Sequence, residues 1–337
     1  MSRCKGRGKG SGDCAERCPP SLWKRLWLLV LVAWLVWLVL ALVRLCRATA
    51  RDPKHRPGDG TVPPWAYRQP DPLIYSQAYL QAQGLAVTWN NPDIHLERAS
   101  TPGVAVDSSA LDPATDYVAV ARIWNASTTA PAVDLPVKLS YLEFGIGTQR
   151  HDVGMTTVDL SVKGGGACPV FARLPWRTPA APGHYCLQVE LLWDDDANPG
   201  NNMGQHNTNV RPLNSPHAAF TFPVRNEAGE RRLLRLEADA YQIPAPEPCP
   251  PPASEQEAER QRRAQLARHQ RAAWPIPVGW QVTLDPAQAA LGPGEATEVT
   301  VDITAPDGFR GRQAINVHAF DGPRIVGGVT LFVDGAG

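Results

Sequence analysis

The chain has 337 residues with 33 basic and 33 acidic side chains, so its formal net charge is zero. This balance argues against a nucleic-acid-binding protein, which normally carries a basic excess. The 33 prolines and 28 glycines disfavour long helices and favour short strands joined by turns. The composition therefore predicts a mainly β protein.

The N-terminal region combines a polar tail with one long apolar segment. Residues 1–21 interleave glycines with basic residues and are predicted to be a disordered cytoplasmic tail. Residues 22–46 contain Leu26–Val43, which has no charged residue, glycine or proline. As a helix this segment rises ~27 Å, close to the ~30 Å hydrocarbon core of a bilayer. We expect a transmembrane helix that contacts membrane lipid through Leu26–Val43.

The flanks of this segment predict its orientation. Seven basic residues precede it and five follow it up to residue 56, which favours a cytoplasmic N-terminus and extracytoplasmic C-terminal domains. A cleaved signal peptide is the alternative, because Ala48-Thr49-Ala50 fits an A-x-A cleavage site. However, the apolar stretch is longer than usual for a signal peptide, and Arg44 and Arg47 separate it from that site.

Residues 47–84 are predicted to form a stalk followed by a short helix. Five prolines between residues 53 and 70 favour an extended chain. Asp71-Pro72 is typical of a helix start, and Gly84 after Gln83 is typical of a helix end.

From residue 85 onward the apolar residues recur with a period of two. Alternation over 117–123, 133–141 and 185–193 indicates strands with one buried and one wet face. In the last of these segments, alternate residues are predicted to face inward: Tyr185, Leu187, Val189, Leu191 and Trp193. Cys186, Gln188 and Glu190 are predicted to face outward.

The passages TTAPAVDLPVKLSY and LPWRTPAAPGHYCLQVELLWDDDANPGNN resemble bacterial immunoglobulin-like domains of the CARDB type over residues 85–212. The resemblance implies an immunoglobulin-like β-sandwich that serves in adhesion, spacing or recognition, without catalytic residues.

A second unit is predicted over residues 213–337. Alternating segments recur at 220–224, 234–240, 278–284, 299–303, 315–319 and 329–333. Residues 245–275 interrupt them with a Pro-rich segment and a helix-forming segment that begins at the capping box Ser254–Glu257. Leu266 is the only large apolar residue between Pro252 and Trp274, so we expect an exposed insertion. The phrase VTLDPAQAALGPGEATEVTVDITAP resembles the NEW3 type of immunoglobulin-like module appended to bacterial surface proteins.

The fold class predicted from the sequence is thus all-β, with two tandem immunoglobulin-like antiparallel β-sandwiches preceded by one transmembrane α-helix. No motif for a catalytic residue, a cofactor or a metal-dependent hydrolase is present in the sequence.

Three weaker candidate sites remain. One loop gathers oxygen ligands suited to Ca²⁺, although the same residues are good turn formers: Asp194, Asp195, Asp196, Asn198, Asn201 and Asn202. Cys168 and Cys186 are a possible disulfide pair, but their strand parity places them on opposite faces. Asn125-Ala126-Ser127 is an N-glycosylation sequon, or simply a turn.

We expect a membrane-anchored extracytoplasmic structural or recognition protein, an adhesion or scaffold molecule that binds an unidentified protein or a surface glycan and no nucleic acid. An accessory subunit of a membrane-bound envelope or export complex is the alternative. An enzyme is the least favoured class, because the loops of sandwiches rarely supply a pocket of convergent polar groups.

Overall fold

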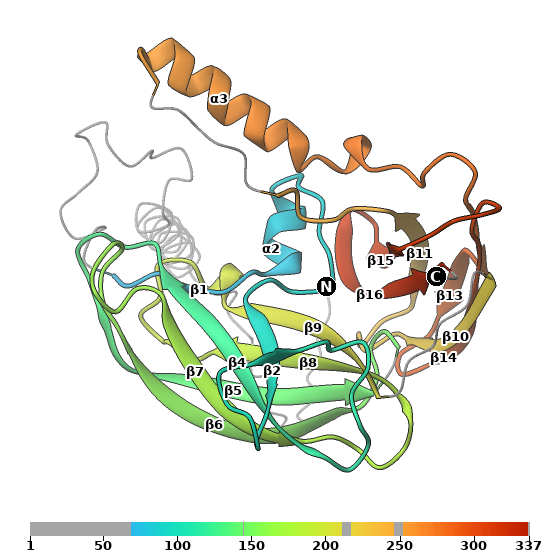
Figure 1. Cartoon of the computed structure of the whole chain (residues 1–337), viewed down its shortest axis with the longest axis horizontal. Coiled ribbons are helices and arrows are strands. Elements are labelled where there is room, and N and C mark those ends of the chain that lie inside the picture. The colour runs from blue at the N-terminus through green and yellow to red at the C-terminus, as the bar shows by residue number, and fades with distance from the viewer. Residues whose placement is uncertain (1–68, 144, 211–216, 246–251, 336–337) are drawn as a thin grey trace, which may run out of the picture. The chain divides into compact units, whose positions relative to one another are not determined.

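The structure of the protein is a computed structural model that describes residues 69–143, 145–210, 217–245 and 252–335. The predicted tail, transmembrane helix and Pro-rich stalk precede residue 69 and so lie outside the described residues. No helix within the described ranges is long and apolar enough to span a bilayer. The described chain is mostly β-strand, arranged in four antiparallel sheets (Figure 1).

Two of these sheets, the first sheet pair, enclose one apolar core. The five-stranded sheet has the order β1-β4-β2-β3, with β7 also paired to β4, and the four-stranded sheet has the order β6-β5-β8-β9. Their bounds are β1 Pro72–Leu73, β2 Ile94–Arg98, β3 Ala105–Val106, β4 Asp116–Asn125, β5 Ala132–Glu143, β6 Arg150–Leu160, β7 Val170–Arg177, β8 Gly183–Leu191 and β9 Met203–Val210. Leu96, Leu139 and Leu187 are fully buried between the two sheets. Burial of such side chains, at about 25 cal/mol per Å² of apolar surface, is the main force that holds the sheets together.

The other two sheets, the second sheet pair, enclose a separate core. The orders are β10-β14-β12 and β13-β11-β15-β16. Their bounds are β10 His217–Arg225, β11 Arg232–Asp239, β12 Gln281–Asp285, β13 Gln288–Leu291, β14 Ala296–Thr304, β15 Arg312–Asp321 and β16 Arg324–Asp334. Phe222, Val301 and Val317 are among its buried residues. The predicted domain boundary, between residues 212 and 213, falls in a gap between the described ranges.

The strand β8 shows how far the alternation in the sequence held. Leu187 and Val189 are fully buried and Leu191 is 3% exposed, as the inward set predicts. Gln188, predicted to be wet, is only 5% exposed. Its side chain accepts a hydrogen bond from Gln205 on β9 and donates one to Glu190. The prediction of a wet outer face was therefore wrong at this residue.

A bulge overturns the predicted parity at the start of β5. Val133 was expected to be buried but is 59% exposed, whereas Ala132 is fully buried. The pairing with β6 shifts between Ala132 and Leu135, and Asp134 has a φ of +55°. One extra residue in a strand reverses the face on which the preceding residue lies.

The helix predicted to begin at Asp71-Pro72 begins five residues later. The helix α2 covers Gln77–Ala82 and is capped by the Ser76 hydroxyl, which accepts from the Tyr79 N–H. Pro72 and Leu73 instead pair with β4, because Asn125 accepts a hydrogen bond from the Asp71 N–H and fixes the chain along that strand. The predicted stop is in place: Gly84 adopts a φ of +79° just after the helix.

The predicted insertion contains the helix α3, Glu255–Arg268, in which no residue is buried. Figure 1 shows α3 leading away from the strands. The residues after it behave differently. The Ala86 N–H donates to the His269 carbonyl at 2.7 Å, and Leu85 and Gln270 form an isolated β-bridge. Within the predicted insertion, α3 thus buries no residue, whereas the residues that follow it bond to the segment between α2 and β2.

The burial pattern of β8 predicts the outcome of one matched pair of substitutions. Leu187→Ala should cost about 2–5 kcal/mol, through lost burial and the cavity left behind. Leu192→Ala, the same change at a residue that is 45% exposed, should cost far less. Denaturant unfolding of the full chain measures both, and equal losses for the two variants would contradict the assigned faces.

Candidate functional site

The most elaborate polar cluster in the structure surrounds the Asp239 carboxylate at the end of β11. Asp239 is 2% exposed, and each of its oxygens accepts more than one hydrogen bond. One oxygen receives bonds from the Asn316 amide at 2.9 Å and the Tyr241 N–H at 3.1 Å. The other oxygen accepts a hydrogen bond from the Arg271 Nε–H at 3.0 Å and lies 2.9 Å from His318 Nε2. A buried carboxylate needs this many partners to offset the loss of hydration.

The pKa of Asp239 reflects two opposing effects. Burial raises it, while the contact with His318 and the hydrogen bonds from Asn316 and Tyr241 lower it, and the net pKa lies below the usual range. Asp239 is therefore ionised at neutral pH. Its contribution to stability is present above the ordinary carboxyl pKa and is lost as the pH falls through the lower value.

The cluster continues across to the segment that leads into β2. The Trp89 indole N–H donates to His318 Nδ1 at 3.2 Å, and the Trp89 backbone N–H donates to the Thr330 hydroxyl at 2.9 Å. Thr330 in turn donates to the Asn316 side chain at 2.7 Å. Trp89 and Val87 pack on Phe320 and Ile325 in a small apolar cluster. The outer face of the β11–β15–β16 sheet is thus covered by residues that lie between α2 and β2 in the chain.

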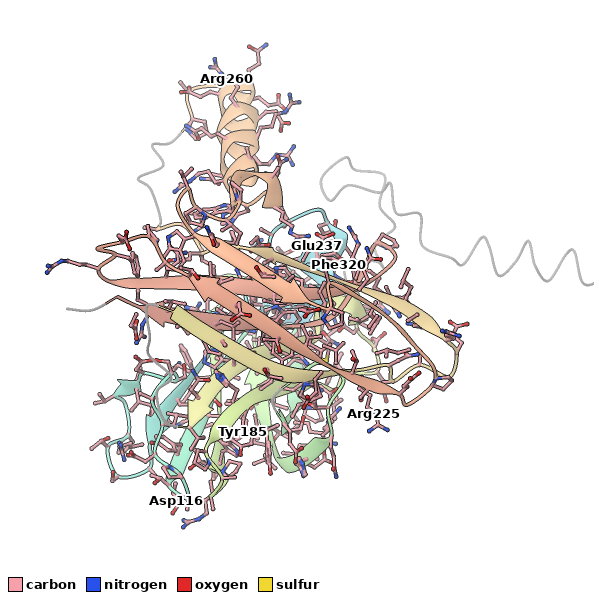
Figure 2. The ribbon with its side chains drawn as sticks, turned by 90° about the vertical axis from the view of Figure 1, so that its right-hand side faces the viewer. Asp116, Tyr185, Arg225, Glu237, Arg260 and Phe320 are labelled. Carbon is pink, nitrogen blue, oxygen red and sulfur yellow. The ribbon has the colours of Figure 1, made fainter. Side chains whose placement is uncertain are left out.

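Arg271 joins the end of the insertion to this cluster. It forms ion pairs with Asp239 and Glu237, and its guanidinium lies 5.1 Å from the centroid of the Phe320 ring. Nδ1 of the neighbouring His269 lies 2.7 Å from the Tyr241 hydroxyl, which is hydrogen-bond distance. Figure 2 shows Glu237 and Phe320 near the base of α3 and Arg260 at its far end. The base of the helix is therefore tied to this cluster.

A cleft of about 1010 Å³ opens between α2, the β10–β11 turn and the β15–β16 hairpin. Its apolar lining includes Ile146 and Ile325, and its polar lining includes Tyr79 and Arg225. The volume is at the upper end of the ~300–1,000 Å³ range of small-ligand sites. No carboxylate in the described part of the chain pairs with Arg225, which is exposed at the edge in Figure 2.

The wall of this cleft is held by a close backbone approach. The Ile146 N–H donates to the Pro223 carbonyl and the Arg225 N–H donates to the Ile146 carbonyl, at 2.9 and 2.8 Å. A Cβ on Gly147 would lie 2.5 Å from the Arg225 carbonyl oxygen, and Gly147 has a φ of +67°. Only glycine fits there, so this close approach of the two backbones depends on Gly147.

The predicted Ca²⁺ loop makes hydrogen bonds to itself and to the N-terminal segment. Asp196, 7% exposed, accepts from the Asn198 N–H and the Asn202 amide. The Asn201 amide donates to Asp71 at 2.9 Å, and Asp195 accepts from Gln69. Within the described ranges no three His, Cys, Asp or Glu side chains come together as a metal site. The loop holds residues 69–71 beside the first sheet pair.

The two candidate cysteines are not bonded to each other: both Cys168 and Cys186 are free thiols. Cys168 packs against the first core, and its sulfur accepts from the Asn125 N–H at 3.3 Å. Cys186 lies on the face of β8 that points away from this core, and burial raises the pKa of its thiol to about 12. A thiol with this pKa is a poor nucleophile at neutral pH.

Asn125 of the sequon is 2% exposed, and its amide donates to the carbonyls of Ala130 and Ser161. An amide held in this way cannot accept a glycan in the folded protein. The alternative interpretation of this sequence, a turn, is the one that the structure favours.

Sequence reasoning missed the cluster around Asp239. Its members come from residues far apart in the chain, and none belongs to a known motif. One signal was present: the outward positions of β15 read Asn316, His318 and Phe320. A large aromatic residue on a face assumed to be wet indicates that a second layer covers it.

Comparisons with known proteins identify no family. No family model matches the chain, and no curated protein matches it. Among solved structures, Escherichia coli alpha-2-macroglobulin activated by porcine elastase is 10% identical, with a TM-score of 0.23 over 72% of this chain and 22% of that one. Red sea bream transglutaminase is 11% identical, with a TM-score of 0.20 over 76% of this chain and 32% of that one. The chain thus spans less than a third of either structure, and such likenesses carry no conclusion about its activity.

The contrast between α3 and the residues after it generates a prediction. Arg271→Ala should destabilise the protein by about 2 kcal/mol, because it removes one partner of a buried carboxylate. Arg262→Ala, the same change on the exposed α3, and replacement of residues 252–266 by a Gly-Ser linker should leave the melting temperature nearly unchanged. Thermal unfolding of the full chain distinguishes them. A large loss on replacing 252–266 would mean that α3 packs against the sheets.

Proposed function

We propose that the protein is a membrane-anchored extracytoplasmic recognition or scaffold molecule, with two tandem immunoglobulin-like sandwiches displayed as one unit. The predicted anchor is Leu26–Val43, and the N-terminus is assigned to the cytoplasm. The protein acts by binding and display rather than by catalysis. Its partner is a protein or a glycan of the cell surface.

The observation that carries this proposal is the cleft beside α2. Its wall is fixed by the Ile146–Arg225 backbone contacts, and its lining combines apolar side chains with Arg225. Preformed surfaces of this composition favour binding, because little ordering entropy is lost on association. The CARDB-like and NEW3-like sequence patterns, which are typical of adhesion and spacer modules, point in the same direction.

The alternative, an accessory subunit of a membrane-bound envelope or export complex, is favoured by α3. A helix that buries none of its residues gains no packing energy, and an isolated helix of this length is marginal in water. This helix is supported by its Ser254 cap and by ion pairs from Glu259 to Arg262 and Arg263. A rigid polar helix held away from the sheets is suited to contact a second subunit.

The two roles differ in the surface that binds. The full chain, purified in detergent and immobilised, should retain a component of an envelope extract at fixed stoichiometry. If the cleft binds, Arg225→Glu should abolish retention, while Arg310→Glu, the same charge reversal on an exposed loop, should not. If α3 binds, replacing residues 252–266 should abolish it instead. Retention that survives both changes contradicts both assignments.

A further inference from the structure

The strand β12 lies at one edge of the three-stranded sheet of the second sheet pair. It pairs with β14 along its whole length, from Gln281 opposite Thr304 to Asp285 opposite Thr300, and with no other strand of the described chain. An edge strand turns alternate N–H and C=O groups away from its own sheet, where a further strand can bond to them. β12 therefore presents a second row of backbone groups to which no described strand bonds.

This edge lacks the features that usually block such pairing. The register with β14 is continuous, so no bulge twists the strand away, and the strand contains neither lysine nor proline. The other edge of the same sheet is partly covered, because Ile146 exchanges backbone hydrogen bonds with Pro223 and Arg225 on β10. Of the two edges of this sheet, β12 is thus the one that can accept a further strand.

The apolar side of β12 is incompletely covered. Val282 and Leu284 pack against the second core, and Trp280 and Pro286 continue the same alternation just beyond the ends of the strand. All four are only half-buried, whereas Val301, directly opposite Leu284 on β14, is fully buried. The second core is therefore open to solvent at this edge, and an added strand would remove this apolar surface from water.

This apolar row is complementary to itself when two copies of β12 run antiparallel about Thr283. Val282 of each copy then lies opposite Leu284 of the other copy. Trp280 of each copy lies opposite Pro286 of the other copy. Every cross-strand pair on this side is apolar, and apolar side chains directly opposite each other stabilise an antiparallel pair of strands.

The outward side of the same arrangement is complementary too. Thr283 lies opposite Thr283 of the other copy, where two hydroxyls can share a hydrogen bond. The Gln281 amide lies opposite the Asp285 carboxylate, which can accept its N–H. No like charges meet, and the two copies are related by a twofold axis. Because both copies use the same edge, the pairing closes at two copies and does not grow into a fibre.

We propose that β12 pairs with β12 of a second copy of this chain, so that the β10-β14-β12 sheets of two copies join into one continuous antiparallel sheet. The half-buried apolar row then lies inside the interface, and the free backbone groups of each edge bond to the other. The homodimer is independent of the partner that the cleft or α3 binds. It displays each binding surface twice, which increases the avidity for a partner with repeated sites.

The test is sedimentation equilibrium of the full chain in density-matched detergent, which gives the protein mass over a series of concentrations. The wild type should reach the mass of a dimer as the concentration rises. Thr283→Glu should stay monomeric, because two carboxylates then face each other across the twofold axis, beside Asp302 of each copy. Thr221→Glu, the same change at an exposed residue of β10 in the same sheet, should dimerise like the wild type.

A mixture of two variants distinguishes self-pairing from a general effect of the added charge. Thr283→Lys mixed in equal amounts with Thr283→Glu should form a mixed dimer, because a lysine then lies opposite a glutamate. The two variants carry different dyes, so the absorbance at two wavelengths identifies the mixed dimer. Far-UV circular dichroism of each variant confirms that its strands are intact.

Three results overturn the proposal: a wild type that stays monomeric at every concentration, a Thr283→Glu variant that dimerises as the wild type does, or an equal mixture without a mixed dimer. If Thr283→Glu fails to fold, amide hydrogen exchange of the wild type decides. The amides of β12 should become more protected as the concentration rises, while those of β3, an edge strand of the first sheet pair, should not change. Protection of β12 that does not depend on concentration contradicts the proposed pairing.

Discussion

The structure depends on the burial of one carboxylate, that of Asp239. An ionised group at 2% exposure is tolerated only because its oxygens accept hydrogen bonds from several partners: Asn316, Tyr241, Arg271 and His318. These partners come from β15, from the end of β11 and from the segment after α3. Each of those elements is therefore fixed in place by the same requirement, and the bond from Trp89 to His318 extends it to the segment Thr88–Asn91. Removing a single partner leaves the charge less compensated in a medium that cannot solvate it.

This requirement explains why α3 is exposed while the residues that follow it contact the second sheet pair. Apart from three alanines and Leu266, the side chains of the helix α3 are polar, and none of its residues is buried. Arg271, a few residues later, has a buried carboxylate to neutralise and an aromatic face, Phe320, to cover. The chain must therefore return to the sheet at that point. The exposed helix is held between two ends whose positions the sheets determine.

The sequence predicted the antiparallel strands well where one face is apolar and the other meets solvent. Leu187, Val189 and Leu191 are buried as their alternation indicates. It failed where a second contact covers the other face, as at Gln188, and where a bulge shifts the parity, as at Val133. A bulge depends on the pairing of two strands, and that pairing is not written in either strand alone.

The candidate site was harder to predict for a related reason. Trp89, Asp239 and His318 are separated by 150 and 79 positions, so no spacing rule connects them. Local patterns instead drew attention to the Asp194–Asn202 loop and to Cys168 and Cys186. In the structure Asp196 of this loop accepts hydrogen bonds from Asn198 and Asn202, and the two cysteines are not bonded to each other. Polar residues that bridge two cores follow no local sequence pattern, because the hydrogen-bond partner of each residue lies far away in the chain.

The central claim is that the segment Thr88–Asn91, through the contacts of Trp89 with both sheet pairs, couples the two cores into one cooperative unit. Scanning calorimetry of the full chain in detergent at pH 7.5 tests it directly. The wild type should unfold its β-structure in one transition, with a ratio of calorimetric to van't Hoff enthalpy near ~1. Trp89→Ala should split that transition into two. Two independent transitions in the wild type, or a single one that survives in Trp89→Ala, would contradict the claim.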